Sequence, residues 1–149
     1  MIALRPMTAD DAALQHRLLS VTLRYPVSYA AVEARLREAP PPSFAAPRFT
    51  VERDGVAVGW VVLDGVTPES RHADVELVLD SWDYGAEVVE AVCRWAFDAI
   101  GLHRLQAWAE DAERVAAYEA AGFVREGVAR DRTFRGGHWH DAVLLGRLA

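Results

Sequence analysis

The chain has 149 residues, the usual size of one domain, so we expect a single domain over 1–149. Its 16 Lys and Arg against 22 Asp and Glu give a net charge of −6. Because phosphate-backbone binding needs clustered basic residues, this balance speaks against a nucleic-acid partner and favours a cationic or amine-bearing one. No window approaches about 18 consecutive apolar residues, so no membrane partner is expected. With Cys93 as its one cysteine, the chain forms no internal disulfide, which favours a cytoplasmic location.

The N-terminal third combines one extended and two helical segments. Residues 2–5 predict a short strand, and Thr8 or Asp10 can cap the helix that follows. A second helix is predicted from Tyr29 to Glu38, and the prolines at 40–42 predict a loop. Strands are then expected on the C-terminal side of this loop.

Residues 48–53 and 56–63 predict a β-hairpin, since the Asp54-Gly55 dipeptide between them tolerates the positive φ of a two-residue turn. The next strand alternates from residue 73 to residue 80, so that one face is apolar and the other is partly acidic. The acidic side chains of that second face are Asp74, Glu76 and Asp80.

The C-terminal half alternates between helical and strand periods. Gly101 and Gly122 are placed to end helices, and Asp111 is placed to begin one. The predicted elements are a helix over 86–100, a strand over 104–110, a helix over 112–121, and strands over 123–130 and 138–147. The whole order predicts an α/β (α+β) fold with a mixed, mostly antiparallel central sheet of about seven strands flanked by four helices.

Four segments of this half occur in a characteristic order. They are Leu77-Val78-Leu79, the helix with Glu90-Ala91 and Trp95-Ala96-Phe97, Gly101 to Leu105, and Tyr118 to Phe123. In order and spacing they resemble the GNAT superfamily of acetyl-CoA dependent N-acetyltransferases, and within it the ribosomal-protein-alanine N-acetyltransferase-like subgroup. The resemblance implies direct transfer of acetyl from acetyl-CoA to a primary amine, on a small molecule or a protein N-terminus, by an enzyme that forms a homodimer.

By this resemblance the backbone amides of Leu77, Val78 and Leu79 hold the pantetheine arm of acetyl-CoA and polarise its carbonyl. Tyr118 stands where the family places a general acid, and a phenol of pKa about 10 keeps its proton at neutral pH. The alternative for Tyr118 is a packing residue on its helix.

Acetyl transfer also needs a group that accepts the proton of the amine. Asp74 and Glu76 project from one strand face and are the candidates, with a solvated or ion-paired strand face as the alternative. Gln106 occupies a position where some relatives carry a catalytic Glu, and an amide cannot act as that base.

In this family a glycine-rich turn at a helix N-terminus binds the pyrophosphate of the co-substrate through backbone N–H groups. The usual pattern is Gln or Arg, two residues, Gly, one residue, then Gly or Ala. One register places Asp83, Ala86 and Val88 in those positions, and the other places Trp82, Gly85 and Glu87 there. The candidate cofactor-binding residues of the turn are therefore Gly85, Ala86, Glu87 and Val88.

These departures have a physical cost, because Asp83 or Glu87 would repel a pyrophosphate and side chains hinder close backbone approach. Asp111 replaces the Asn that the family carries before the last helix, and Arg114 replaces a small residue and can meet a phosphate instead. A second hypothesis follows, in which the chain is a catalytically inactive GNAT-fold ligand-binding or interaction module that has lost acetyl-CoA binding.

Other chemistry-bearing residues have plainer interpretations. His138 and His140 share a strand face, but two imidazoles are too few for a metal site, so none is expected. Cys93 lies on an apolar helix stripe and is predicted to be a buried hydrophobe. Trp82 and Trp108 are the tryptophans that we expect at a surface or a pocket.

Overall fold

The structure, a computed structural model, describes residues 1–22, 26–39 and 47–149. Its seven-stranded sheet has the order β1-β2-β3-β4-β5-β7-β6, and each neighbouring pair is antiparallel except β4 and β5. The strands are β1 (Ile2–Pro6), β2 (Arg48–Arg53), β3 (Val56–Asp64), β4 (His72–Leu79), β5 (Arg104–Ala109), β6 (Val124–Arg135) and β7 (His138–Leu148). The predicted mixed, mostly antiparallel sheet is confirmed, while the loop predicted at 40–42 lies outside the described residues.

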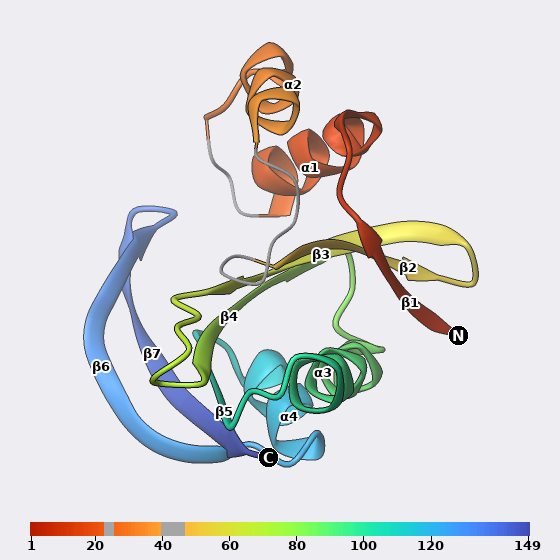
Figure 1. The fold of residues 1–149 in the computed structure, drawn as a ribbon. Helices are drawn as coiled ribbons and strands as arrows, with labels where there is room; N and C mark the ends of the chain where they lie inside the picture. The colour runs from red at the N-terminus through yellow and green to blue at the C-terminus, as the bar shows by residue number, and fades with distance from the viewer. Residues whose placement is uncertain (23–25, 40–46) are drawn as a thin grey trace.

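In the described part of the chain four α-helices cover the sheet: α1 (Ala12–Arg17), α2 (Tyr29–Glu38), α3 (Gly85–Arg94) and α4 (Ala112–Ala120). A 3₁₀ turn at Ala9–Asp11 leads into α1, and π-helical turns at Leu18–Thr22 and Trp95–Ala99 extend α1 and α3. Figure 1 shows α1 and α2 on one face of the sheet, α3 and α4 on the other, and the β6–β7 hairpin curling beside β4. None of the described helices is long and apolar enough to cross a membrane.

The main core lies between the sheet and the α3–α4 layer. On β4, Ala73, Leu77 and Leu79 belong to this core, as the alternation of the strand predicts. Val78 points to the opposite face, where it packs with Leu18 and Trp60 in a smaller cluster beneath α1. The two faces of β4 are therefore buried by different helical layers.

The predicted β2–β3 hairpin is confirmed, with both turn residues in the left-handed region. Asp54 has φ 51° and Gly55 has φ 80°. This pair of positive angles is typical of a two-residue turn whose twist matches that of the flanking strands.

A buried carboxylate fastens the start of α1 to the sheet. Asp11 is 3% exposed and accepts hydrogen bonds from Arg5 on β1 at 2.7 and 3.0 Å. The hydroxyl of Thr50 on β2 and the backbone N–H of Thr8 also donate to it, each at 2.8 Å. Burial raises the pKa of Asp11, but the bonds from Arg5, Thr8 and Thr50 outweigh burial and hold the pKa below its ordinary value.

Strands β3 and β4 approach closely at Gly59. A Cβ on this residue would lie 2.1 Å from the carbonyl oxygen of Val78 and 3.0 Å from the Cα of Leu79. Both atoms belong to the backbone of β4, so they cannot rotate away. Gly127 on β6 offers a contrast, since a Cβ there would meet nothing within 4 Å.

We expect Gly59→Ala to lower the free energy of unfolding by about 1–3 kcal/mol, because the added methyl group forces β3 away from β4. Gly127→Ala is the matched control on another strand and should stay within about 0.5 kcal/mol of the parent. Urea denaturation followed by circular dichroism measures both, and equal midpoints for the two variants would contradict the close approach.

We expect Asp11→Asn to destabilise the chain by about 1–3 kcal/mol at neutral pH, since the amide leaves Arg5 without its buried partner. A carboxylate whose folded pKa is lowered stabilises the fold above its unfolded pKa and loses that effect as pH falls through the folded value. The difference between parent and variant should therefore shrink below about pH 4. The exposed neighbour Asp10, changed to Asn, serves as the control in thermal melts across pH, and a difference that is independent of pH would refute the role of the carboxylate.

Candidate active site

The site forms where β4 and β5 part. The two parallel strands pair only from His72 to Asp74 and from Arg104 to Gln106, although β4 continues to Leu79 and β5 to Ala109. Beyond Asp74 the edge of β4 that faces β5 has no partner strand among the described residues. The sheet is thus open from this point onward.

Backbone alternation shows which groups lie on the open edge of β4. The N–H of Asp80 donates to the carbonyl of Val58 on β3 at 2.9 Å. Because N–H directions alternate along a strand, the amides of Leu77 and Leu79 point toward β5 and that of Val78 points toward β3. The Val78 amide is therefore turned toward β3, and of the three predicted amides those of Leu77 and Leu79 face the opening.

A cavity of about 710 Å³ occupies this opening. Its walls are residues 74–78 of β4, Trp108 of β5, the inner face of α4, and residues 132–136, which are the far end of β6 and the first residue of the turn after it. Trp82, in the turn between β4 and α3, also lines it, so both tryptophans that were predicted to lie at a surface or a pocket, Trp82 and Trp108, line this cavity. The cavity joins parts of the chain that are distant in sequence.

Tyr118 reaches the cavity from α4. It is 3% exposed, and its ring lies between Trp82, at 6.0 Å between ring centres, and Phe123, at 5.0 Å. Burial raises the pKa of the Tyr118 hydroxyl, and nearby Arg114 opposes this only in part. The hydroxyl therefore keeps its proton at neutral pH and is able to donate it.

Asp74 is held in place by a chain of polar side chains. Gln106, its register partner on β5, donates its amide N–H to Asp74 Oδ1. Arg104 donates to the amide oxygen of Gln106 at 3.1 Å and pairs with Glu126. The amide at position 106 thus contacts a carboxylate on one side and a guanidinium on the other, a role that Glu could not fill.

The candidate proton acceptors and the candidate proton donor lie on different sides of the sheet. Asp74 and Glu76 project from the face of β4 opposite the α3–α4 core, and Gln106 and Trp108 project from the same face of β5. Tyr118 comes from α4, on the other side. They line one cavity because β4 and β5 are separated there.

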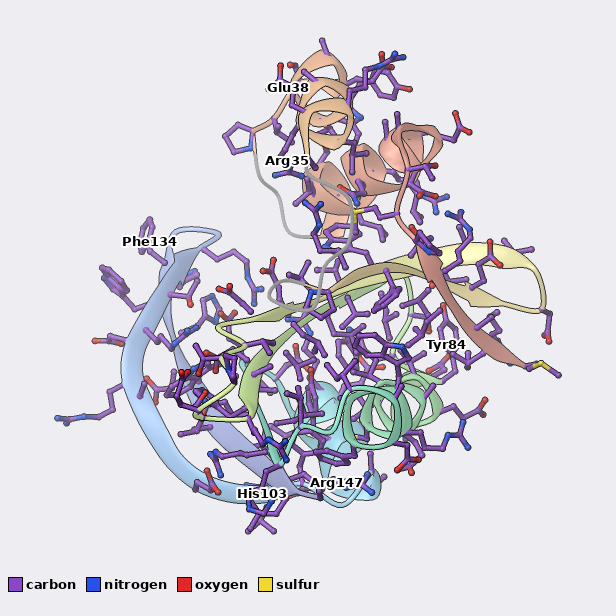
Figure 2. The ribbon with its side chains drawn as sticks, viewed as in Figure 1. Arg35, Glu38, Tyr84, His103, Phe134 and Arg147 are labelled. Atoms are coloured by element: carbon purple, nitrogen blue, oxygen red, sulfur yellow. The ribbon has the colours of Figure 1, made fainter. Side chains whose placement is uncertain are left out.

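The turn before α3 differs from either predicted register. Tyr84 is the N-cap and Gly85 the first helical residue, and Gly85 donates its N–H to the carbonyl of Trp82 at 2.9 Å. The Tyr84 hydroxyl bonds to Asp80, and the guanidinium of Arg53 lies 4.7 Å from the Tyr84 ring centre. Figure 2 labels Tyr84 beside the start of α3.

The amides in the first turn of α3 differ in whether they have a hydrogen-bond acceptor within the described residues. Val88 donates its N–H to the carbonyl of Tyr84 at 3.2 Å, and its side chain is fully buried in the core, so its amide already has an acceptor within the chain. The amides of Ala86 and Glu87 have no recorded acceptor among the described residues and are the available anion donors. Asp83 and the Glu87 side chain are exposed, so water screens their charge.

Trp82 takes up the space next to Gly85. A Cβ at Gly85 would lie 2.6 Å from Trp82 Cε3 and 3.1 Å from the Cβ of Ala117. Within the described residues the buried indole N–H of Trp82 has no hydrogen-bond partner. A tryptophan with a free donor therefore packs against the glycine that begins α3.

Asp111 and Arg114 act together at the start of α4. The Asp111 carboxylate accepts from the backbone N–H of Arg114 at 2.9 Å and lies 3.2 Å from its Nε. Asp111 lines a separate hollow of about 280 Å³ rather than the main cavity, and its carboxylate caps α4. Arg114 does line the main cavity, with its guanidinium 5.4 Å from the Trp82 ring centre.

Several residues of the cavity were missed by the sequence analysis. Arg132 lies 4.5 Å over the ring of Trp108, and Arg135 is 3.1 Å from Glu110. The predicted strand ended at residue 130, but β6 continues to Arg135 through a bulge after Ala129. Asp131 in the bulge has φ 48°, which breaks the period of two that would have marked the strand.

The remaining reactive side chains lie apart from the cavity. His140 contacts the carbonyl of Arg135 at 3.1 Å, and His138 is exposed. No group of three His, Cys, Asp or Glu residues within the described ranges is placed to hold a metal ion. Cys93 is 1% exposed, and burial raises the pKa of its thiol to about 11.

Comparisons with known proteins agree with this fold. A family model for the acetyltransferase (GNAT) domain matches residues 2–124. The structure of the spermidine N-acetyltransferase from Vibrio cholerae in complex with CoA and spermine has a TM-score of 0.80 and 21% identity, covering 99% of this chain and 95% of that one. A point mutant of the same enzyme, SpeG, gives a TM-score of 0.79 and 21% identity over 99% and 93% of the two chains.

No curated protein sequence matches the chain. At 21% identity the solved structures establish the likeness of fold, and the family model, which spans most of the chain, establishes the family. The hypothesis of an inactive module that has lost acetyl-CoA binding is not supported. The chain belongs to the GNAT acetyltransferase family and is an N-acetyltransferase that uses acetyl-CoA.

Proposed function

We propose that the chain acetylates a small-molecule primary amine, which binds as a cation to the acidic face of the cavity. One observation carries the proposal: the opening between β4 and β5 puts Tyr118 in the same cavity as Asp74 and Glu76. A proton donor and two proton acceptors thus share the space in which an acyl group would pass to an amine.

The residues present fit acetyl-CoA, which supplies an acetyl group activated as a thioester. The amides of Leu77 and Leu79 on the open edge of β4 would hold its pantetheine arm. The first-turn amides of Ala86 and Glu87 would donate to its phosphates, and Arg114 would add the positive charge that the glycine loop lacks. The unpartnered indole N–H of Trp82 provides a further donor on the same side.

Asp74 and Glu76 would attract the ammonium form of the acceptor and take up its proton, directly or through water. Gln106 keeps the Asp74 carboxylate in a fixed orientation, which supports Asp74 as the principal acceptor of that proton. Glu76 is exposed and has no recorded ion pair within the described residues, so it contributes mainly charge.

Tyr118 would donate its proton to the sulfur of the departing thiolate. Its raised pKa favours the protonated phenol throughout the physiological range. Its position on α4, next to Trp82 and beneath the open edge of β4, supports this role better than that of a packing residue alone.

The identity of the acceptor follows from the shape and charge of the site. The candidate groups line a cavity rather than a flat surface, which favours a small molecule over the protein N-terminus that the ribosomal-protein-alanine subgroup would imply. The acidic face and the net charge of −6 favour a cation, and the structural neighbours named above are spermidine acetyltransferases.

We also propose a cytoplasmic enzyme that forms a homodimer. The single buried cysteine is consistent with a reducing compartment. Val124 and Val128 are 65% and 64% exposed on the edge strand β6, and covering such side chains favours self-association.

Calorimetric titration with acetyl-CoA tests the donor site without needing the acceptor. We expect saturable binding to the parent and about 10- to 100-fold weaker binding to Arg114→Ala, which loses a charge-assisted contact with phosphate. Arg94→Ala removes an exposed charge from the far end of α3 and should bind like the parent. Absence of binding to the parent would refute the proposed function.

Tyr118→Phe should lower kcat by about 10²- to 10⁴-fold, because the thiolate would leave without a proton donor, and the Kd for acetyl-CoA should stay unchanged. The matched control is Tyr29→Phe, which removes a hydroxyl from α2, away from the cavity. Since its pKa is raised, Tyr118 should cause no loss of kcat between about pH 7 and pH 9. Steady-state rates of CoA release measure both effects, and full activity in Tyr118→Phe would exclude the general-acid role.

A further inference from the structure

Two of the three arginines that line the cavity have a carboxylate partner, and Arg132 is the exception among the described residues. Arg135 pairs with Glu110 at 3.1 Å, and Arg114 pairs with Asp111 at 3.2 Å. Arg132 has no recorded ion pair with any carboxylate of the described residues, although it lines the cavity. Its positive charge is therefore available to a ligand.

The guanidinium of Arg132 is held by an aromatic ring instead. It lies 4.5 Å from the ring centre of Trp108, within the range of a cation–π interaction. Such a contact orients the planar group without neutralising it, and leaves its N–H donors free for a carboxylate. The neighbouring residues Thr133 and Phe134 continue the same wall, at the end of the β6–β7 hairpin where Figure 2 labels Phe134.

The opposite wall carries unpaired charge of the other sign. Asp64 on β3 and Asp74 on β4 are register partners, and Glu76 follows on the same face of β4. All three line the cavity, and none has a recorded ion pair in the described part of the chain. The cavity is thus bipolar, with carboxylates on the β3–β4 side and a guanidinium on the β6 side.

Strand β5 sets the distance between these two walls. Gln106, which bonds to Asp74, and Trp108, which lies under Arg132, are two residues apart on one face of this strand. A step of two residues along a strand is roughly 7 Å. A small acceptor can therefore contact Asp74 and Arg132 at the same time.

We propose that the acceptor carries a carboxylate as well as its amine, and that Arg132 binds this carboxylate while the amine faces Asp74. The inference rests on the proposed function and names its substrate class: an amino acid or a similar aminocarboxylate. A single guanidinium balances one negative charge, whereas a phosphate dianion would face the acidic wall with excess charge. A polyamine would leave Arg132 unmatched and place a second cation beside it.

Matched acceptor pairs that differ by the carboxylate test the proposal: L-leucine against 3-methylbutylamine, and L-phenylalanine against 2-phenylethylamine, with spermidine as the purely cationic probe. At saturating acetyl-CoA we expect kcat/KM to be about 10- to 100-fold higher for the amino acid of each pair, the size of one charge-assisted contact. Arg132→Gln should abolish this preference by raising KM for the amino acids and leaving the values for the amines unchanged.

The control is Arg130→Gln, which removes an exposed charge from the same strand outside the cavity and should keep the preference. The proposal is overturned if spermidine or the simple amines match the amino acids, or if Arg132→Gln leaves the preference intact. It is also overturned if the parent binds acetyl-CoA but no probe shows turnover or calorimetric binding that depends on its carboxylate. In each of these cases the donor site stands, whereas failure of acetyl-CoA to bind the parent would refute the transferase function itself.

Discussion

The structure depends on one feature: backbone pairing between β4 and β5 stops before either strand ends. A continuous parallel pair would use the backbone groups of both strands and bury Tyr118 against a closed sheet. By parting after Asp74 and Gln106, the strands leave the amides of Leu77 and Leu79 free and connect the two faces of the sheet. The donor and acceptor of a transfer reaction can then meet inside one sheet rather than at its edge.

Polar contacts hold this open region where backbone pairing has stopped. The chain from Glu126 through Arg104 and Gln106 to Asp74 crosses from β6 to β4, so the last register pair is fixed by side chains as well as by backbone. Each interior member contacts a neighbour on both sides, which a carboxylate at position 106 would prevent by repelling Asp74. The departure from the family pattern at this position thus has a structural reason within the chain itself.

Local periodicity was sufficient to predict most elements of the fold, because elements such as β5 and α3 have one buried face. The alternation on β4 and the turn at Asp54-Gly55 are cases in which a residue and its immediate neighbours decide the conformation. The site was harder to predict from the sequence, since it depends on strand register and on long-range contacts. The carbonyl of Tyr84 accepts the hydrogen bond of the Val88 amide, and the bulge at Asp131 places Arg132 at the cavity. Neither feature can be recognised from the periodicity of the sequence.

Cys93 gives the protein an internal reporter of its own motions. Its thiol is buried between α3 and the sheet, and burial raises its pKa to about 11, so in the closed state it is a poor nucleophile toward alkylating reagents. Modification requires α3 to lift from the sheet, and the labelling rate therefore measures the free energy of that local opening. Because α3 also carries the first-turn amides assigned to the phosphates, a bound co-substrate would slow the labelling by holding this helix down.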